Sequence, residues 1–138
     1  IQKDDMELLY PHLRSADSIV MASPIYFQGM PAVPKMVIDR CQPFWALKYV
    51  MKQALVEPGR PPRLGAFLSC SGTTLSRAFE GSSLVMKTVW NVLQVTSVGE
   101  VLCPGIDMKG EIREQPSAQV AAEQIGRRLA EATERKGA

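Results

Sequence analysis

Histidine and cysteine are scarce in this sequence, and their scarcity excludes several kinds of site. His12 has no second histidine or nearby cysteine to complete a metal site or a catalytic pair, so we interpret it as an exposed helix residue. Cys41, Cys70 and Cys103 are widely spaced and odd in number, which argues against a disulfide framework or a zinc module. We therefore predict no metal site, and we expect a reducing, cytoplasmic location.

Long apolar runs and an excess of one charge are also lacking. No stretch of about 18 apolar residues is present to span a bilayer, and no charged leader precedes an apolar segment. The formal net charge is only +2, and the basic residues are scattered without interleaved aromatic residues. The sequence thus predicts neither a membrane partner nor a nucleic-acid partner.

The chain has the composition of an ordinary globular protein. Its 138 residues are 46% hydrophobic and 22% charged, which predicts a single domain over residues 1–138 with a sizeable core. Read in order, the elements alternate between helix and strand, beginning and ending with a helix. This order predicts a parallel sheet with helices on both faces, because crossover connections return each strand in the same direction.

The most informative stretch runs from Ala16 to Phe27. Strand-like residues from Ser18 to Ala22 stop at Ser23-Pro24, where proline removes a backbone donor and turns the preceding residue away from helical geometry. Because the run is apolar throughout, we expect a parallel strand covered on both faces. A helical pattern follows from Pro34 to Pro43. Strand, shaped loop and crossover helix are typical of α/β proteins, which hold ligands at such loops.

A second predicted strand, Arg63 to Leu68, also ends in small polar residues, Ser69-Cys70-Ser71-Gly72-Thr73-Thr74. A nucleophile elbow is excluded because Ser69 and Thr73 stand where it needs glycine, and no histidine follows as a base. A cysteine-phosphatase loop has five residues between cysteine and arginine, whereas six separate Cys70 from Arg77. An ordinary turn between strand and helix remains an alternative.

The other elements follow from helical spacing and turn residues. We expect Pro11 to kink the first helix, and Ser82-Ser83 to cap a helix that carries Val89 and Thr96. The final helix, from Ser117, is predicted to cover the sheet. The remaining segments are a helical stretch at Lys48–Val56, a loop at Glu57–Pro62, a short strand at Gly99–Gly105 and a polar loop at Asp107–Pro116.

Together these residues resemble the flavodoxin-fold NAD(P)H-dependent FMN reductases, which include the iron–sulfur flavoproteins. The resemblance is densest from Asp4 to Trp45. It implies an α/β fold, a flavodoxin-like parallel sheet flanked by helices, with five strands in the order 2-1-3-4-5 and FMN beside the switch point. The resemblance rests on Asp17-Ser18-Ile19-Val20, Ser23-Pro24-Ile25-Tyr26-Phe27, Lys35 and Ile38-Asp39-Arg40.

Aligned on this resemblance, the chain begins at the helix before the family's third strand. The fold is therefore expected to be incomplete at the N-terminus, lacking the first two strands, the first helix and the phosphate loop that holds FMN through backbone donors. The strand at 18–22 would then have an exposed apolar edge. The sequence opens with Ile1, so we favour a piece of a longer polypeptide over a second copy that covers the gap.

The resemblance also implies the site. Residues 23–27 would frame one side of the flavin ring and residues 69–72 another edge. FMN would be the cofactor and would carry the redox chemistry, so no catalytic side chain is nominated. The three cysteines do not reproduce a Cys-x-x-Cys pattern, and no iron–sulfur cluster is expected on them. The predicted cofactor-binding residues are Ser23, Pro24, Ile25, Tyr26, Phe27, Ser69, Cys70, Ser71 and Gly72.

The implied activity is hydride transfer from NAD(P)H, as co-substrate, to FMN and then to free flavin, a quinone or another acceptor. The expected partners are a small-molecule electron donor and acceptor, with a homo-oligomer as the assembly. Helix packing or a dimer contact is the role expected of Lys35, Asp39 and Arg40. The aromatic pair Phe44-Trp45 would belong to the core or an interface, or would place a ring beside the flavin. An electron-transfer protein and an interaction domain without cofactor are the alternative functions.

Overall fold

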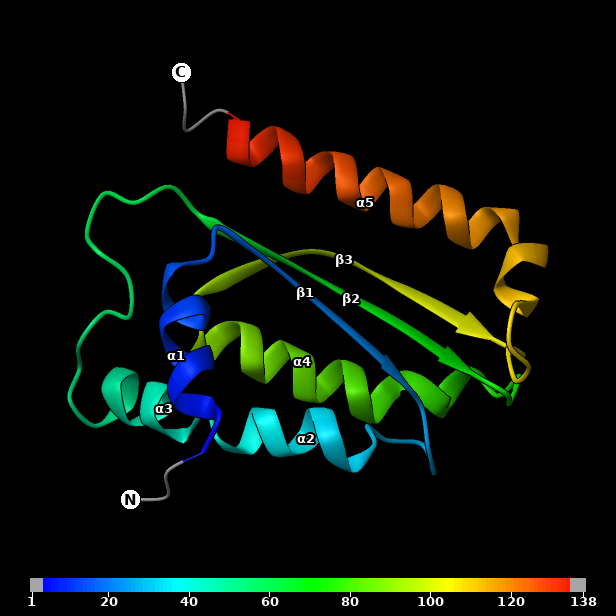
Figure 1. Ribbon diagram of the computed structural model, residues 1–138, viewed down its shortest axis with the longest axis horizontal. Helices are drawn as coiled ribbons and strands as arrows, with labels where there is room; N and C mark the ends of the chain where they lie inside the picture. Colours follow the sequence, from blue (N-terminus) through cyan, green and yellow to red (C-terminus); the bar gives the residue numbers. More distant parts are fainter. Residues whose placement is uncertain (1–3, 135–138) are drawn as a thin grey trace.

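Three parallel strands form the sheet of this protein, whose computed structural model describes residues 4–134 (Figure 1). They are β1 (Ser18–Pro24), β2 (Arg63–Ser71) and β3 (Val95–Pro104), and they pair in the order β1-β2-β3. Both pairings are parallel, so the carboxyl ends of all three strands lie at the same edge. The predicted parallel α/β sheet is confirmed.

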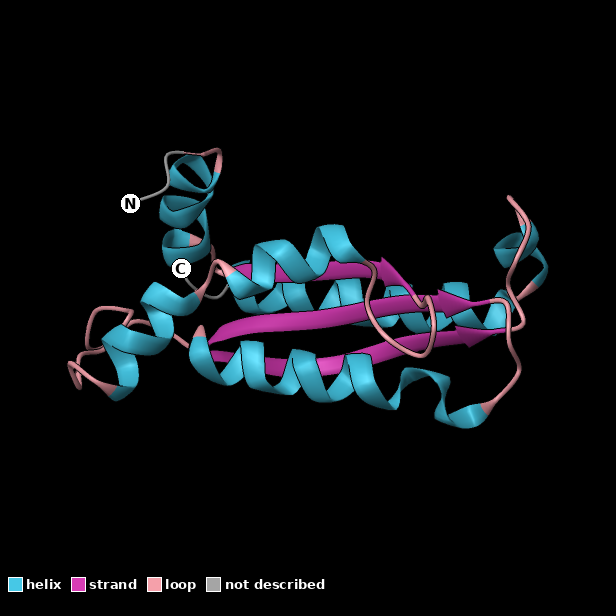
Figure 2. Ribbon diagram, turned by 90° about the horizontal axis from the view of Figure 1, so that it is seen from below, coloured by secondary structure: helices cyan, strands magenta, loops and turns pink. Residues whose placement is uncertain are grey.

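Helices cover both faces of this sheet. α5 lies on one face, while α2 and α4 lie across the other, with α1 and α3 near its end (Figures 1 and 2). The predicted alternation of helix and strand is confirmed, with α3 as an additional helix. The helices are α1 (Met6–Ser15), α2 (Ala32–Asp39), α3 (Gln42–Tyr49), α4 (Glu80–Val92) and α5 (Pro116–Glu134), with short 3-10 helices at Ser76–Phe79 and Glu111–Glu114. Within the described residues, no helix has the length and apolar character needed to cross a membrane.

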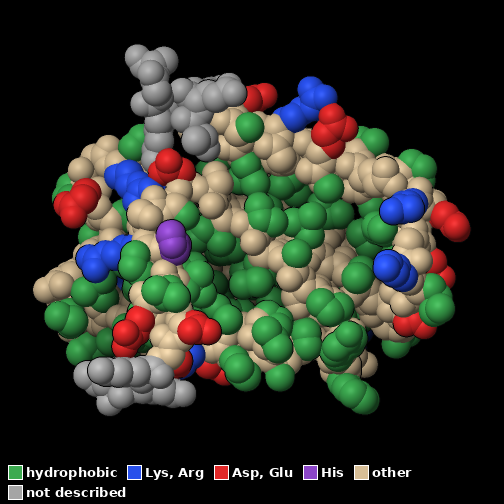
Figure 3. Space-filling view, viewed as in Figure 1, with side chains coloured by type: hydrophobic (Ala, Val, Ile, Leu, Met, Phe, Trp, Pro, Cys, Tyr) green, Lys and Arg blue, Asp and Glu red, His purple; other side chains and the backbone are tan. Residues whose placement is uncertain are grey.

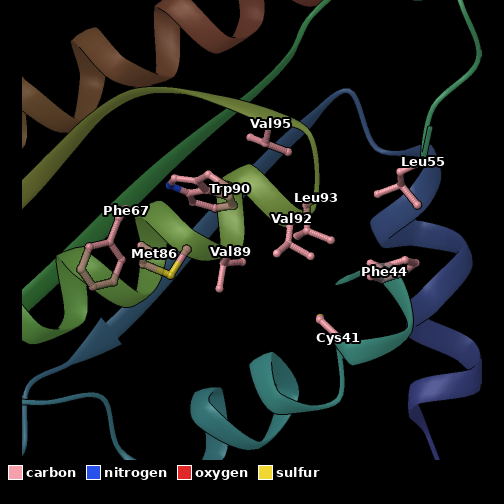
Figure 4. Packing of buried hydrophobic residues seen from close by; sticks show 10 residues of the cluster. All are labelled: Cys41, Phe44, Leu55, Phe67, Met86, Val89, Trp90, Val92, Leu93 and Val95. Carbon is pink, nitrogen blue, oxygen red and sulfur yellow. The ribbon is translucent and has the colours of Figure 1, made fainter. Parts of the chain in front are cut away.

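The larger core lies between the sheet and helices α1 to α4 (Figure 4). Phe67 from β2 and Met86 from α4 are fully buried at its centre. Phe44 from α3 is also buried and packs edge-on against Tyr10, with ring centroids 5.5 Å apart. Trp45 turns outward beside Tyr49 instead, so only the first of the predicted aromatic pair belongs to the core.

The smaller core lies between the sheet and α5. Ala66 and Val101 from the sheet pack there with Ile125 and Leu129 from the helix. These two helix residues are four positions apart and so lie on one face, as the helical spacing predicted. The prediction that the last helix covers the sheet is confirmed.

Strand β1 departs from the expectation of a strand covered on both faces. Ile19 and Met21 pack into the larger core, but Val20 is 54% exposed on the opposite face and Ala22 is exposed as well. Among the described residues β1 pairs only with β2, so it forms an edge of the sheet. Figure 3 shows hydrophobic side chains gathered across the middle of this side of the molecule.

Several predicted boundaries were wrong. The predicted helix at 48–56 is absent, since α3 ends at Tyr49 and Lys52 has a positive φ of 52°. Ser82 does not cap α4, because the helix begins at Glu80. The Ser82 side chain is fully buried. Thr96 belongs to β3, because a turn at Gln94, where φ is 54°, ends the helix earlier.

Proline also has a different effect from the one predicted. α1 runs through Pro11 without a break, although a kink or restart was expected there. Pro43 does not simply end a helix: it occupies the first turn of α3, where its missing N–H has no intrahelical partner to lose. The helix predicted from Pro34 to Pro43 is therefore two short helices, divided at Arg40–Cys41.

Candidate functional site

The loops that follow β1 and β2 face each other across a cleft of about 360 Å³ at the carboxyl edge of the sheet. The first loop contributes residues 25–28 and the second residues 71–73 and 75. Carboxyl ends of parallel strands are where α/β proteins bind ligands. Five of the nine predicted site residues meet here: Ile25, Tyr26, Phe27, Ser71 and Gly72.

The other four predicted residues lie beside a second cavity. Ser23, Pro24, Ser69 and Cys70 line an apolar cavity of about 420 Å³ between the sheet and α5. Residues 23–24 and 69–70 belong to β1 and β2, and Ser71, the last residue of β2, already lines the cleft. The structure therefore brings the nine residues to one edge of the sheet but divides them between two hollows.

Buried hydroxyl groups fix the strand ends beneath the cleft. Ser69 Oγ donates to the backbone carbonyl of Ser23 over 2.7 Å, and Ser23 Oγ donates to the carbonyl of Pro24 over 3.0 Å. The N–H of Ile25 then donates to the carbonyl of Cys70 over 2.9 Å, which carries the pairing one residue beyond the strand. These serines hold the backbone in place instead of presenting their hydroxyls to the cleft.

The first loop contains a tight turn from Tyr26 to Gly29. These two residues exchange backbone hydrogen bonds of 2.9 and 3.1 Å, and the central residues, Phe27 and Gln28, have φ angles of 50° and 61°. Two consecutive positive φ angles define a type I′ turn, which usually employs asparagine and glycine because a Cβ makes this conformation costly. The Phe27 ring is fully exposed at the tip of the turn.

The second loop is held by the segment that follows β3. The carbonyl of Ser71 accepts from the N–H of Ile106 over 2.9 Å, and that of Thr73 accepts from Gly105 over 3.2 Å. Gly72 leaves room for Asp107, since a Cβ added to Gly72 would lie 2.9 Å from Oδ1 of Asp107. Asp107 is itself part of a turn whose N–H groups donate to Glu111.

Glu111 stabilises that turn electrostatically. Its Oε2 atom accepts hydrogen bonds of 2.8 Å from the N–H groups of Asp107 and Met108. These bonds lower the pKa of the Glu111 carboxyl group, because they favour its charged form. The supporting segment beneath Gly72 is thus tied to an ionised carboxylate.

The lining of the cleft is aromatic, small and uncharged. Tyr26 carries the one ionisable side chain among its lining residues, and no lysine or arginine is among them. Such a surface suits a planar, uncharged ring better than a phosphate, which needs cationic or helix N-terminal partners. Tyr26 and Phe27 expose enough ring surface to contact a flat ligand.

Sequence reasoning missed several lining residues. Gln28, Thr73 and Leu75 border the cleft, and Cys103 borders the apolar cavity. Thr73 and Cys103 carried the same signal as the predicted residues, since both stand where a strand ends in small residues. Gln28 and Leu75 carried none, because only the folded turns bring them to the cleft.

Other predicted features lie away from the cleft. His12 is exposed in the last turn of α1, as predicted. Lys35 and Asp39 form an exposed ion pair of 2.7 Å along α2, and Arg40 pairs with Asp4 at 3.0 Å, joining α2 to the chain before α1. Within residues 4–134 no cluster of three or more potential metal ligands occurs. Trp45 is not among the residues that line the cleft.

Two iron–sulfur flavoproteins of Archaeoglobus fulgidus are similar in sequence. One is 49% identical over 47 residues, which are 34% of this chain and 24% of that protein. The other is 26% identical over 142 residues, covering 99% of this chain and 55% of that protein. The chain therefore spans about half, or less, of the length of these relatives.

Solved structures share the fold. The Trp repressor binding protein from Bacillus subtilis superposes with a TM-score of 0.67 at 18% identity, covering 90% of this chain and 71% of that one. A flavone reductase gives a TM-score of 0.66 at 19% identity, covering 97% and 49%. These likenesses show the flavodoxin-like fold. The sequence model of the NADPH-dependent FMN reductase family matches residues 1–101, so the chain belongs to that family.

Proposed function

We propose that this chain is the part of an FMN-dependent NAD(P)H oxidoreductase that contacts the flavin ring. The observation that carries the proposal is the meeting of two strand-end loops at one aromatic, uncharged cleft. The family resemblance of the sequence implies that both loops contact the flavin, and the family match supports the cofactor. Because the chain spans only part of its relatives, the activity proposed is that of the whole protein.

The cleft residues would bind and orient the ring. The exposed side chains of Tyr26 and Phe27 supply planar contact surface, and Ser71 and Gly72 allow close approach from the opposite loop. Packing of Ile25 against Ala78 and Phe79 would keep the first loop in register beneath the ring. The described residues would therefore position the ring and exclude water from one side of it.

When bound, FMN supplies the redox chemistry by accepting a hydride equivalent from NAD(P)H and releasing the electrons to an acceptor. The protein then needs no acid or base, which agrees with a lining that has Tyr26 as its one ionisable side chain. A small-molecule donor and a small-molecule acceptor, a quinone or another flavin, are the proposed partners. The predicted homo-oligomer and cytoplasmic location stay predictions.

Flavin binding is the first test, and riboflavin is the sharper probe because it carries the ring without the phosphate. Fluorescence titration should show saturable binding of riboflavin, with FMN binding within about threefold because the cleft holds no cation for a phosphate. Phe27→Ala should weaken riboflavin binding roughly tenfold, the loss of one aromatic contact. Leu8→Ala removes an exposed apolar side chain from α1 and should leave binding unchanged.

Three outcomes would contradict the proposal. Absence of binding by both flavins would favour an interaction domain without cofactor. Equal weakening by the changes at Phe27 and Leu8 would mean that the effect is not local to the cleft. Flavin binding by the complete protein without steady-state NAD(P)H oxidation would favour the electron-transfer alternative over the oxidoreductase.

A further inference from the structure

Cys70 and Cys103 are direct neighbours on adjacent strands. They are register partners in the β2–β3 ladder, and both line the apolar cavity of about 420 Å³ beneath α5. A bulge between Gly65 and Ala66 shifts the register by one residue; without it Leu102 would stand opposite Cys70. The two thiols are thus brought together by the fold of the sheet.

The Cα spacing of parallel strands permits a bond between these residues. Neighbouring strands lie about 4.8 Å apart, which falls within the Cα separations of about 4.4–6.8 Å found in disulfides. Both side chains belong to the smaller core, so they leave the sheet on the same face. Cys41 belongs to the larger core on the other face, where its Sγ atom donates to the carbonyl of Val37 over 3.4 Å.

The two thiols differ in access. Cys70 is half-buried, whereas Cys103 is 5% exposed. Burial, and to a lesser extent the neighbouring Cys70, raise the pKa of the Cys103 thiol. A reagent entering the cavity therefore meets Cys70 first, and Cys103 lies behind it as a second thiol.

We propose that Cys70 and Cys103 form a two-thiol modification site that a small organic disulfide oxidises to an intramolecular disulfide. The Cys70 thiolate attacks one sulfur of the reagent, forming a mixed disulfide and releasing one thiol. The Cys103 sulfur, losing its proton to solvent, then attacks the Cys70 sulfur and releases the second thiol. Two cysteine thiols are oxidised, the reagent is reduced to two thiols, and this site does not depend on the proposed function.

The position of the pair near the strand ends permits the movement that the bond requires. The ladder ends one register position later, at Ser71 and Pro104, and proline has no N–H to donate to it. The Cβ atoms of register partners on parallel strands keep roughly the strand spacing of about 4.8 Å. This exceeds the mean Cβ separation of about 3.8 Å in disulfides, so we expect a strained and readily reduced bond. Its closure would draw the end of β2, and with it Ser71 of the cleft, toward β3.

Dithiodipyridine is a suitable probe, because each half of the reagent that leaves is released as a pyridinethione, which is counted by its absorbance. One equivalent added to the reduced chain should release two pyridinethiones and leave the protein lighter by about 2 Da, the two hydrogens lost in a disulfide. Peptide mapping should find Cys70 linked to Cys103. Cys103→Ser should release one pyridinethione at Cys70 and retain the pyridyl group there, and Cys41→Ser should behave like the wild type.

Accessibility of the two thiols can be compared directly. In Cys70→Ser, the buried Cys103 should react roughly tenfold more slowly than Cys70 does in Cys103→Ser. Thermal melting of each reduced variant checks that it is folded. The proposal would be overturned by a wild-type chain that keeps a pyridyl group on Cys70, or by a disulfide that links Cys41.

Discussion

The hydroxyl of Ser69 donates a 2.7 Å hydrogen bond to the backbone carbonyl of Ser23. The two residues are register partners in the β1–β2 ladder, and both are almost completely buried. Each stands just before the loop that its strand contributes to the candidate site. The bond therefore joins the bases of the two loops from inside the protein.

Removal of this hydroxyl should weaken the domain modestly. Ser69→Ala is expected to lower the free energy of unfolding by about 1 kcal/mol, the usual net contribution of a buried hydrogen bond. Ser82 is a matched control, because it is equally buried but its hydroxyl has no partner among the described residues. Ser82→Ala should be neutral or stabilising by up to about 1 kcal/mol. Urea denaturation of both variants measures the difference, and equal losses would refute the assignment.

Arg63 connects β2 with the ends of two helices. Its buried guanidinium donates to the carbonyls of Ala16 and Leu93 over 2.8 and 2.7 Å, and also to that of Leu13. Burial lowers the pKa of this group, but an arginine starts from so high a value that it stays charged. It thus satisfies carbonyls at the carboxyl ends of α1 and α4.

Arg63→Met should destabilise the protein by about 3 kcal/mol, because buried carbonyls lose a charged donor. Arg63→Lys should fall between this variant and the wild type, since one ammonium cannot reproduce the planar fork. Arg128 donates to the carbonyl of Val98 over 2.9 Å but is exposed, so Arg128→Met should cost less than about 0.5 kcal/mol. A similar loss at both positions in chemical denaturation would contradict this account.

Cys41 makes the stability depend on alkaline pH. Burial raises the pKa of its thiol from 9.0 to about 11, so the unfolded chain loses this proton at a lower pH than the folded chain. Stability from this group is present below about pH 9 and is lost as the pH rises toward 11. Between about pH 8 and pH 11 the wild type should lose about 2 kcal/mol more than Cys41→Ala. Parallel pH dependences of unfolding would show that Cys41 titrates alike in both states.

The turn at Tyr26–Gly29 should be improved by glycine. Gln28 has a φ of 61°, which a Cβ makes unfavourable, so Gln28→Gly is expected to stabilise the protein by about 0.5–1 kcal/mol. Gln28→Ala removes the same polar group but keeps the Cβ, and it should give no such gain. Thermal or chemical unfolding compares the two, and a gain with alanine would locate the strain in the side chain instead of the backbone.

Local chemistry made much of this protein predictable. The apolar run from Ser18 to Ala22, stopped by Ser23-Pro24, required only neighbouring residues to predict a strand and a loop. The same was true of the strand from Arg63 and of the final helix. Once the order of elements predicted a parallel sheet, the two loops had to lie at its carboxyl edge. That much of the fold and the site follows from the sequence.

The boundaries that failed depend on contacts between distant residues. Serine is a common residue at helix caps, yet Ser82 lies inside α4 with its side chain buried. The apolar run predicts that Val20 is buried, but its burial depends on which segments pack on that face of the sheet. Local propensity does not depend on the distant segments that pack against Ser82 and Val20, so tertiary packing overrides it.

The sequence by itself determined that small and aromatic residues would meet at one edge of a parallel sheet. Only the tertiary structure decided that Ser23, Pro24, Ser69 and Cys70 line a different hollow from the residues that follow them, because α5, which is distant in the sequence, supplies the other wall of that hollow. It also decided that Cys70 meets Cys103. A single-residue bulge sets that register, and a shift by one position would have turned the partner to the opposite face of the sheet.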